Sequence, residues 1–577
     1  MASTSPTTLE KRSPIQPTNS ENDSLSDLRE GTEPISNVCF IGAGHVGGTA
    51  AAVTAYHNPH LLVTRWNSKH LPIFEPSLRE VVRIARDGAR PLTVKGAIVV
   101  PERSPNLFFS SSNTCIGEAD IIFITVNTPT KASGRGEGYA TDMAALEAAV
   151  KEIGLHARRG TIIVEKSTLT DYRLGQLFDI VSNPEFLSAG TAVKDLMDPD
   201  RVLIGCSPTP AGHRAASTLA DLYAGYNGSW VSPDRIMRTN VWSSELSKLV
   251  TNSMLAQRIS SINSISAIYE KTDAEIEEVA TAIGCDSRIG DRFLKAGIGF
   301  GGSCFKKDIL SLIYLAQSLG LEEVAEYWQQ VIKMNDYQRA RFAGRVVQCL
   351  NNTLTGKKIT FLGYAFKGDT SDTRGSPTLE VIKTLQDEDP AEIAIFDPYC
   401  DNVDIQKELE ALCIQGRGCL TEKGTCHLSV YSNVYEACRQ SSALLITTEH
   451  ECFVNSVRPF RANGGEEYSD TRPCLSPWPT RLKVLEALVQ RACDEPSCAD
   501  GCAECKHIES RGDTRAELSS GSRGLEDVED WRRMIDSMAK PRWLFDGRGI
   551  IDPKEMAKLN IRVESIGRRS LRWDEPS

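Results

Sequence analysis

The sequence predicts an α/β protein in which two Rossmann-like, doubly wound domains are joined by a central helical region. Three observations support this prediction. A short apolar run leads into Gly42-x-Gly44-x-x-Gly47 and then into an Ala-rich helical stretch. A second strand, loop, helix and strand pattern follows Lys357, and residues 240–340 between the two patterns carry apolar residues at helical spacing. Alternating strands and helices are typical of parallel sheets with helices on both faces.

The composition argues against a protein that binds nucleic acid. The chain has 577 residues, of which 41% are hydrophobic and 24% charged, and its formal net charge is -11. That length accommodates several domains with ordinary cores. Nucleic acid is not expected as a partner, because proteins that bind it usually carry a basic face. Residues 1–36 are rich in Ser, Thr, Pro and acids, and they are expected to form a disordered tail.

The cysteines are interpreted together with the lack of an export signal. No apolar run in the tail is suited to a signal sequence or a membrane span, so a cytoplasmic location without a membrane partner is expected. The chain has 17 cysteines, and cytoplasmic thiols stay reduced. Most of them are therefore expected to be buried apolar residues and not partners in disulfides.

The first domain, residues 37–238, is expected to bind a dinucleotide. Gly42 would form a tight turn, Gly44 would let the backbone approach a pyrophosphate, and Gly47 would allow close helix packing. A glycine-rich turn without a ligand is the alternative, but the flanking strand and helix favour a nucleotide. Further strands are expected in ADIIFITVNTPT and GTIIVEKST, whose hydroxyl residues follow the apolar runs at the edge where a ligand binds.

The acid that usually follows the second strand of such a domain is missing. The strand LLVT at 61–64 runs directly into Arg65, where an acidic residue would hold the adenosine ribose. Arg65 is suited to a 2′-phosphate, so NADP is an alternative to NAD at this site.

The central domain, residues 239–345, is expected to be helical and to contain a reactive cysteine. In GFGGSCFKKD, the glycines before Cys304 let the backbone close around a ligand, and DILSLIYLA after it indicates a helix. A thiol at a helix start, near the following lysines and Lys248, is expected to have a lowered pKa. Asp308 lies one turn later on the same side. A buried core cysteine is the alternative.

The last domain, residues 346–577, repeats the nucleotide-binding pattern. The strand in KKITFLGYAFKGD is followed by the helix TLEVIKTLQ and by the strand EIAIFDP, which ends in Asp397. Later strands in SALLITT and RWLFDGRGIID would complete its sheet. Two such domains separated by helices indicate an enzyme that holds two nucleotides.

Together these motifs resemble the UDP-glucose/GDP-mannose dehydrogenase family in its eukaryotic form. The matching stretches include NVCFIGAGHVGG, WNSKHLPIFEPSL, FITVNTPT, EKST, SNPEFLSAGTAVKDL, WSSELSKL, GFGGSCFKKD, YWQQVIKMNDYQ, GYAFKGDTSDTR and FDGR, in the family's order. The resemblance implies oxidation of the C6 alcohol of UDP-glucose to the carboxylate of UDP-glucuronate by two NAD⁺ in succession. A cysteine thiolate would hold the aldehyde as a thiohemiacetal, which becomes a thioester that water cleaves. It also implies a homo-oligomer, a dimer or larger.

The resemblance assigns roles to individual residues. Lys248 and Asn252 would stabilise oxyanions, Asp308 would orient water, and Glu185 would serve as the base for thioester hydrolysis. The expected catalytic residues are Cys304, Lys248, Asp308, Glu185, Asn252 and Thr168. The expected NAD contacts are Gly42, Gly44, Gly47, Thr128, Thr168 and Arg374, and no metal is expected. The expected substrate contacts are Glu185, Lys248, Asn252, Arg288, Lys295, Gly301, Lys367 and Arg548, with Arg288 reaching in from a neighbouring subunit.

Three departures from the family pattern leave other interpretations open. The chain lacks the segment with the ribose acid, its crossover between Thr168 and Asn183 is short, and it carries an atypical insertion at about 454–526. In the insertion, Cys502 and Cys505 with a nearby Cys or His are a weak candidate zinc site. The alternatives to a UDP-glucose-oxidising enzyme are another nucleotide-sugar dehydrogenase, acting on UDP-ManNAc or GDP-mannose, a catalytically impaired UDP-sugar-binding relative, and a mis-assembled gene model.

Overall fold

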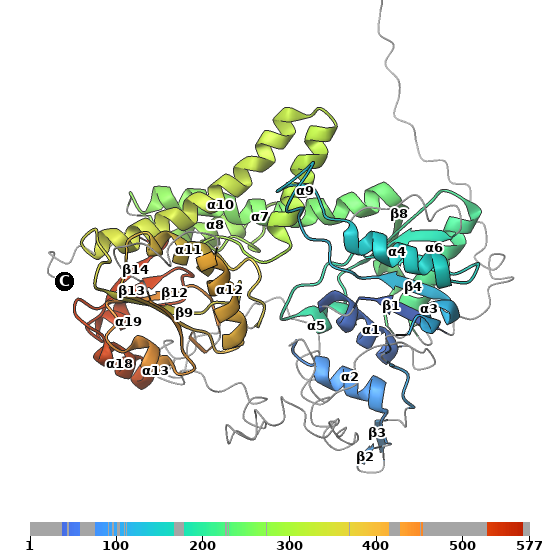
Figure 1. Ribbon diagram of the computed structural model, residues 1–577, viewed down its shortest axis with the longest axis horizontal. Helices are drawn as coiled ribbons and strands as arrows, with labels where there is room; N and C mark the ends of the chain where they lie inside the picture. Colours follow the sequence, from blue (N-terminus) through green and yellow to red (C-terminus); the bar gives the residue numbers. More distant parts are fainter. Residues whose placement is uncertain are drawn as a thin grey trace, which may run out of the picture.

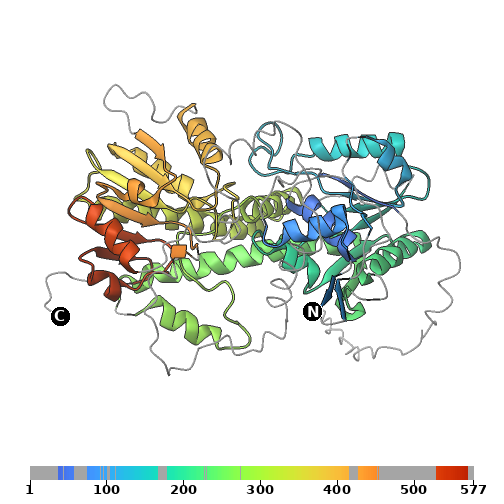
Figure 2. The same ribbon diagram turned by 90° about the horizontal axis from the view of Figure 1, so that it is seen from below.

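The computed structural model describes residues 37–42, 45–57, 75–90, 92–94, 97–100, 104–108, 110, 112–166, 178–225, 228, 230–272, 274–368, 370–414, 427–450, 452–453 and 528–568. Two six-stranded sheets lie at opposite ends of a set of central helices (Figures 1 and 2). The predicted fold class, two doubly wound α/β units joined by helices, is confirmed.

The N-terminal sheet has the strand order β1-β4-β5-β6-β7-β8. The first four of these strands run parallel, β7 is antiparallel to β6, and β8 is parallel to β7. The strands are β1 (Val38–Ile41), β4 (Ile121–Ile124), β5 (Ile162–Glu165), β6 (Asp179–Ser182), β7 (Val202–Cys206) and β8 (Ile236–Asn240). A separate hairpin pairs β2 (Leu92–Val94) with β3 (Ala97–Val100).

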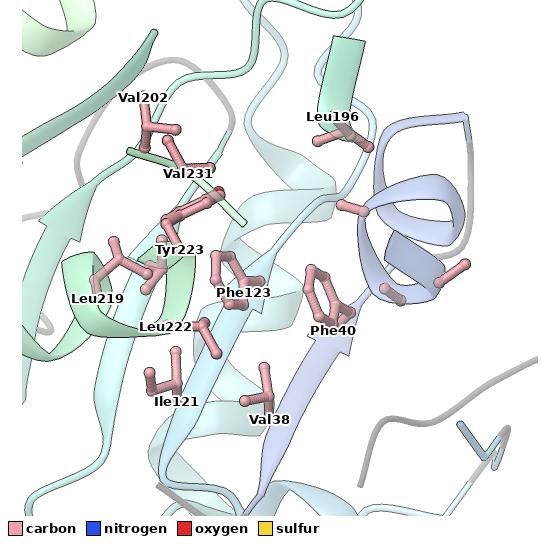
Figure 3. Close-up of a cluster of buried hydrophobic side chains, with 14 of the residues drawn as sticks. Val38, Phe40, Ile121, Phe123, Leu196, Val202, Leu219, Leu222, Tyr223 and Val231 are labelled. Carbon is pink, nitrogen blue, oxygen red and sulfur yellow. The ribbon is translucent and has the colours of Figure 1, made fainter. Parts of the chain in front are cut away.

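Helices cover this sheet and close its core. They are α1 (His45–His57), α2 (Leu78–Asp87), α3 (Thr114–Glu118), α4 (Ala144–His156), α5 (Ala192–Met197) and α6 (Pro210–Ala224), with a 3-10 turn at Pro233–Arg235. Phe40 of β1 and Phe123 of β4 stack with ring centroids 4.5 Å apart, and Tyr223 of α6 lies beside them (Figure 3). Burying each such side chain contributes about 1.5–3 kcal/mol.

The turn between β1 and α1 requires two of its glycines. Gly42 has a φ of +111°, and a Cβ there would lie 2.6 Å from the carbonyl oxygen of Thr125. A Cβ on Gly47 would lie 2.2 Å from the carbonyl oxygen of Gly42. Any larger side chain would therefore push the helix away from the strand ends, as expected of a turn that brings a helix N-terminus close to a ligand.

The central helices connect the two α/β units. They are α7 (Val241–Tyr269), α8 (Ile276–Gly284), α9 (Phe305–Ser318) and α10 (Glu322–Cys349). Helix α7 runs from the N-terminal unit, at the right of Figure 1, to the C-terminal unit at the left. Asn240 caps α7 by accepting a hydrogen bond of 2.8 Å from the amide of Ser243.

The C-terminal sheet is entirely parallel, with the order β11-β10-β9-β12-β13-β14. Its strands are β9 (Lys358–Leu362), β10 (Glu392–Phe396), β11 (His427–Val430), β12 (Ala443–Ile446), β13 (Trp543–Asp546) and β14 (Arg562–Ser565), and its helices are α11 (Pro377–Gln386), α12 (Asn402–Ile414), α13 (Val434–Cys438), α18 (Val528–Ser537) and α19 (Pro553–Ala557). The chain reverses direction across the sheet between β9 and β12, where a doubly wound sheet binds its ligand.

The carboxylate of Asp397, which follows β10, is bound by groups of the protein itself. Its side chain is fully buried and accepts hydrogen bonds from the amides of Tyr364 (2.6 Å) and Ala365 (2.9 Å). It also lies 3.0 Å from Nε2 of His450. Burial alone would raise the pKa of Asp397, but His450 and the amide donors lower it further than burial raises it. This carboxylate therefore holds the loop after β9 in place.

Several sequence features lie outside the described residues. They are the tail at 1–36, the strand at 61–64 with Arg65, and the insertion at about 454–526 with its candidate zinc ligands. Within the described ranges, no three His, Cys, Asp or Glu side chains are grouped so that they could hold a metal ion. Among the helices that the structure describes, none combines the length and the apolar character that a membrane crossing requires.

Candidate active site

Cys304 directly precedes α9 and is exposed to solvent. The glycines before it are needed for close packing. A Cβ on Gly301 would lie 2.7 Å from the carbonyl oxygen of Gly375, and Gly302 has a φ of +84°. The amide of Gly302 donates a hydrogen bond of 3.1 Å to that same carbonyl. The predicted position of the thiol, at a helix start after a glycine turn, is confirmed.

Lys248 and Glu185 form a buried ion pair beside the thiol. Lys248 of α7 donates a hydrogen bond of 2.5 Å to Oε1 of Glu185, and their side chains are 8% and 10% exposed. The other carboxylate oxygen of Glu185 accepts a hydrogen bond of 2.9 Å from the amide of Leu187. The short crossover before β6 therefore does not prevent Glu185 from reaching this site.

Asn252 and Asp308 form a second contact one helical turn further along. Nδ2 of Asn252 donates a hydrogen bond of 2.6 Å to Oδ2 of Asp308, whose side chain is 1% exposed. Nζ of Lys307 lies 3.7 Å from Oδ1 of Asp308 and 3.5 Å from the hydroxyl of Thr128, which follows β4. The N-terminal sheet and helices α7 and α9 thus meet at one place.

The predicted lowering of the Cys304 pKa is wrong. Cys304 is exposed as a residue, but the protein packed around it removes part of the hydration of its thiol, and this loss raises the pKa of the thiol; the carboxylates of Glu185 and Asp308 raise it as well. Lys248 and Lys307 lower it, but they do not compensate for the other contributions. The sequence places lysines next to Cys304, whereas Glu185 arrives from a distant part of the chain.

The ion pair fixes the charge of both its members. Burial lowers the pKa of Lys248, but Glu185, Asp308 and Cys304 raise it more, so the net shift is upward. Burial raises the pKa of Glu185, but the charge and hydrogen bond of Lys248 produce a net downward shift. Lys248 is thus a permanent cation and Glu185 a permanent anion near neutral pH.

Arg548, one of the expected substrate contacts, lies at the C-terminal edge of the second sheet. Arg548 follows β13 and donates hydrogen bonds to the carbonyl oxygens of Thr447 (2.7 Å), Phe366 (3.2 Å) and Gly299 (3.4 Å). It also lies 3.0 Å from Glu449. Arg548 therefore connects the ends of β9, β12 and β13 to the glycine-rich segment before Cys304.

Lys367, Arg374 and Lys295 lie around this edge. Nζ of Lys367 donates a hydrogen bond of 2.8 Å to the hydroxyl of Ser188, across from the second sheet to the first. Arg374 binds Asp372 in a two-pronged ion pair, which raises the pKa of Arg374 with a smaller contribution from Cys304. Lys295 is exposed and close enough to Glu449 to affect its pKa.

The structure does not bring every predicted residue to Cys304. The side chain of Arg288 is 86% exposed and pairs with Asp286 of its own chain. A reach into a neighbouring subunit stays a prediction. Gly44 and Thr168 lie outside the described residues.

Sequence reasoning missed a buried polar chain behind Glu185. Nζ of Lys166 donates to the hydroxyl of Tyr223 (3.1 Å), which donates to Oδ1 of Asn183 (2.6 Å), two residues before Glu185. Lys166 is 5% exposed, and its charge adds to the lowering of the Glu185 pKa. The only signal in the sequence was the position of Lys166 in the EKST motif, beside the expected Thr168.

The arrangement supports covalent chemistry on a carbonyl group. A solvent-exposed thiol has a fixed cation, a carboxylate and an amide donor around it, and this combination serves addition, oxyanion stabilisation and hydrolysis. Lys248 is charged and is therefore suited to stabilise an anion, whereas Glu185 is ionised and suited to accept a proton.

Replacing Glu185 with Gln is expected to speed the alkylation of Cys304. The change removes a nearby negative charge and leaves Lys248 beside the thiol, so the thiol pKa falls. As long as the thiol pKa lies above the pH, each unit by which this pKa falls raises the thiolate fraction about tenfold. The measurement is the rate of iodoacetamide labelling at Cys304 from pH 7 to 10, resolved by mass spectrometry. Glu564→Gln, which removes a carboxylate paired with Arg345 elsewhere, is the control. An unchanged rate in Glu185→Gln would contradict the assignment.

Comparison with known proteins identifies three matching family segments. Models of the UDP-glucose/GDP-mannose dehydrogenase family match residues 36–227 (NAD binding domain), 242–337 (central domain) and 360–477 (UDP binding domain). In the structure, β13 and β14 extend the sheet of the last segment beyond that match.

Similar proteins cover most of the chain. UDP-glucose 6-dehydrogenase of Pongo abelii is 46% identical over 444 residues, which are 73% of this chain and 84% of that protein. UDP-glucose 6-dehydrogenase of Drosophila melanogaster is 38% identical over 559 residues, 93% of this chain and 97% of that protein. The structure of a UDP-glucose dehydrogenase from Pyrobaculum islandicum aligns with a TM-score of 0.58 and 27% identity, covering 73% of this chain and 93% of that one.

A further structure supports the fold alone. UDP-D-ManNAc dehydrogenase from Pyrococcus horikoshii aligns with a TM-score of 0.60 at 19% identity, covering 92% of this chain and 99% of that one. The family segments follow one another in order and include more than half of the residues. The chain belongs to the UDP-glucose/GDP-mannose dehydrogenase family, and it carries that family's NAD-binding, central and UDP-binding domains.

Proposed function

We propose that this protein oxidises UDP-glucose to UDP-glucuronate with two NAD⁺ in succession, through a covalent intermediate on Cys304. The observation that carries the proposal is the placement of an exposed thiol beside Lys248, Glu185 and Asp308. Relatives with high identity over most of the chain are UDP-glucose 6-dehydrogenases, which supports this choice of substrate within the family.

The turn after β1 fits NAD. Gly42 and Gly47 leave no room for a Cβ, so the backbone there is open to close approach by a pyrophosphate. Gly42, Gly44, Gly47, Thr128, Thr168 and Arg374 are proposed to hold the dinucleotide. Bound NAD⁺ supplies the hydride acceptor for both oxidations.

Cys304 and Lys248 are proposed to act on the aldehyde formed by the first oxidation. The sulfur of Cys304 bonds to C6 as the carbon–oxygen double bond opens, and the thiol proton is replaced by one on the former carbonyl oxygen, which gives a thiohemiacetal. C6 then loses a hydride and its hydroxyl loses a proton, which gives a thioester. Lys248 is a fixed cation, so it stabilises the oxyanion that develops at C6, and Asn252 offers an amide donor one turn away.

Glu185 is proposed to complete the reaction. Water attacks the thioester carbon, Glu185 accepts a proton from that water, and the sulfur leaves as the thiol while the carboxylate forms. When Lys248 turns toward the oxyanion, its pairing with Glu185 weakens and the carboxylate becomes more basic. Asp308, and Thr168 in the family motif, are proposed to place the water.

The substrate's nucleotide is proposed to bind at the second sheet. The end of that sheet that faces Cys304 is surrounded by Lys367, Arg548, Gly301 and Lys295.

The proposed domains are the NAD-binding unit at 37–238, the central helical domain at 239–345 and the UDP-sugar-binding unit at 346–577. A cytoplasmic location suits the chemistry because Cys304 must stay reduced.

A homo-oligomer is also proposed. Helix α7 exposes large apolar side chains at positions that share one helical face, which are Trp242, Val250, Met254, Ile265 and Ile268. Exposed large apolar side chains that recur along one side of a helix are typical of a surface that another chain covers. A second copy is proposed to contribute its Arg288 to the neighbouring site. A monomeric mass in sedimentation at micromolar concentration would contradict this part.

The proposed reaction is tested by the stoichiometry of the purified chain. Two NADH and one UDP-glucuronate for each UDP-glucose are expected, with NADH measured by absorbance and the sugar nucleotide by chromatography. NADH formed only with UDP-ManNAc or GDP-mannose would assign another substrate in the same family. No NADH with any of these sugars, while UDP-glucose still binds, would contradict the activity.

A further inference from the structure

The short segment before Cys304 is held by buried amide side chains from two central helices. Asn263 belongs to α7, and Asn335 and Gln338 belong to α10. None of the three side chains touches Cys304, and each is at most 2% exposed as a residue. We name Asn263, Asn335 and Gln338 the amide bracket.

Asn335 binds both backbone groups of Phe300, a residue of this segment. Its Oδ1 accepts a hydrogen bond of 2.9 Å from the amide of Phe300, and its Nδ2 donates one of 3.1 Å to the carbonyl of Phe300. A Cβ on Gly299 would lie 2.2 Å from Oδ1 of Asn335, and Gly299 has a φ of +96°. The Asn335 side chain thus makes the two hydrogen bonds that a neighbouring β-strand would make with Phe300. It fixes the backbone four residues before Cys304.

Asn263 and Gln338 hold the start of the segment in the same way. The amide of Gly297 donates a hydrogen bond of 2.9 Å to Oδ1 of Asn263, and Nε2 of Gln338 donates one of 2.8 Å to the carbonyl of Gly297. Gln338 also reaches Oδ1 of Asn263 at 3.4 Å. Asn263 and Gln338 are therefore joined to each other and to Gly297, whereas Asn335 holds Phe300 three residues further along.

The other side of the segment is bound by the C-terminal unit. The amide of Ile298 donates a hydrogen bond of 2.8 Å to the carbonyl of Gly547, and Arg548 donates one of 3.4 Å to the carbonyl of Gly299. The amide of Gly302 is bonded to Gly375. Backbone groups from 297 to 302 are thus bonded on both sides, which leaves the segment little freedom to shift.

Buried amides at a helix crossing are costly, since apolar side chains would pack there without needing partners. Because these amides are bonded to the glycine-rich backbone at 297–300, we infer that they hold this backbone in one conformation. A displacement of the reacting atom by about 1 Å can reduce a rate by about 10²-fold. The helix α9 that carries Asp308 starts directly after the segment.

We propose that the amide bracket, with Asn335 as its central member, is a positioning device that sets the sulfur of Cys304 against Glu185, Lys248 and the reacting carbon. The inference rests on the proposed function for its consequence in catalysis, but the placement of the thiol is independent of it. Asn335 is a positioning residue and does not touch the substrate.

The first test measures catalysis in Asn335→Leu and Asn335→Asp, with Gln329→Leu on the same helix as the control. Leu keeps the approximate size and removes both hydrogen bonds, whereas Asp keeps the acceptor for the Phe300 amide. We expect kcat with UDP-glucose to fall about tenfold to 10²-fold in Asn335→Leu and less in Asn335→Asp. The Kd for UDP should stay within about twofold, because Asn335 binds Phe300 and contacts none of Lys295, Lys367 and Arg548, which are proposed to hold the nucleotide.

The outcomes separate positioning from general damage. A kcat within twofold of the wild type in folded Asn335→Leu would overturn the proposal. So would a parallel loss of kcat and UDP affinity, since that pattern indicates a disturbed fold. If Asn335→Leu does not fold, Asn335→Asp is judged by the same two criteria.

The second test needs no substrate and therefore distinguishes failure of this proposal from failure of the proposed function. It compares how much Glu185→Gln accelerates iodoacetamide labelling of Cys304 in the wild type and in Asn335→Leu. If Asn335 keeps the sulfur beside Glu185, the acceleration shrinks at least threefold in the Asn335→Leu background, a non-additive effect. An equal acceleration in both backgrounds would overturn the proposal, whether or not the chain produces NADH.

Discussion

Replacing Cys304 with Ala is expected to reduce the conversion of UDP-glucose to UDP-glucuronate by about 10⁴-fold or more, the scale seen when a covalent nucleophile is removed. The first oxidation requires no bond to sulfur, because the alcohol loses a hydride and a proton directly. The second oxidation has no equivalent route, since the aldehyde must first become an adduct that can give up another hydride. The variant should therefore form at most one NADH for each sugar bound.

The measurement is single-turnover NADH formation with enzyme in excess, followed by chromatography of the sugar nucleotide. The control is Cys285→Ala, which removes another exposed cysteine of the central region and should keep two NADH per sugar. Two NADH per sugar from Cys304→Ala, at a rate within tenfold of the wild type, would remove the covalent step from the mechanism.

Replacing Lys248 with Met is expected to lower kcat by about 10²- to 10³-fold, the usual effect of losing one group that stabilises an oxyanion. It should also destabilise the fold by about 3–5 kcal/mol, because Glu185 stays buried without its partner. Both effects follow from one contact, but they respond differently to a second substitution. Lys248→Met with Glu185→Gln should recover much of the stability and none of the activity.

The stability loss has a predicted pH dependence. In the wild type, the pKa of Glu185 lies below its unfolded value, so the pair stabilises the fold above that value and loses this effect as pH falls through the folded pKa. In Lys248→Met, burial acts on Glu185 without compensation, its pKa rises, and the fold is penalised as pH increases. The difference in Tm between variant and wild type should shrink from pH 7 toward pH 4. A constant difference would contradict the assignment.

The fold was largely predictable from sequence because each strand in a parallel sheet is a short apolar run. The runs that became β4, β5, β9, β10, β12 and β13 were all predicted, and so was the helix after Cys304. Strand β14, which is half polar, and the pairing of β6 with β7 were not predicted. Local patterns specify an element, but strand order depends on contacts between distant residues.

The candidate site was predictable in its members but not in its electrostatics. Lys248 and Asn252 stand one helical turn apart, a spacing that is visible in the sequence. The pKa of Cys304 depends on Glu185, which is 119 positions away in the chain, counted as 304 minus 185. Asp308 supplies one carboxylate within GFGGSCFKKD, but nothing in that stretch indicates that Glu185 also lies beside the thiol. Asn335 and Gln338 were equally hidden, since amides in a helical pattern usually face solvent.

The buried carboxylate of Asp397 has a consequence for how the protein keeps its two ligands apart. A protein with two sheets of related topology risks receiving a dinucleotide in the wrong one. In a dinucleotide site, the acid at this strand tip must face the ligand to grip its ribose. Here the equivalent acid is fully buried and bonded to the protein's own backbone and to His450. The C-terminal half therefore offers no free acid at this strand tip with which to bind the ribose of a dinucleotide.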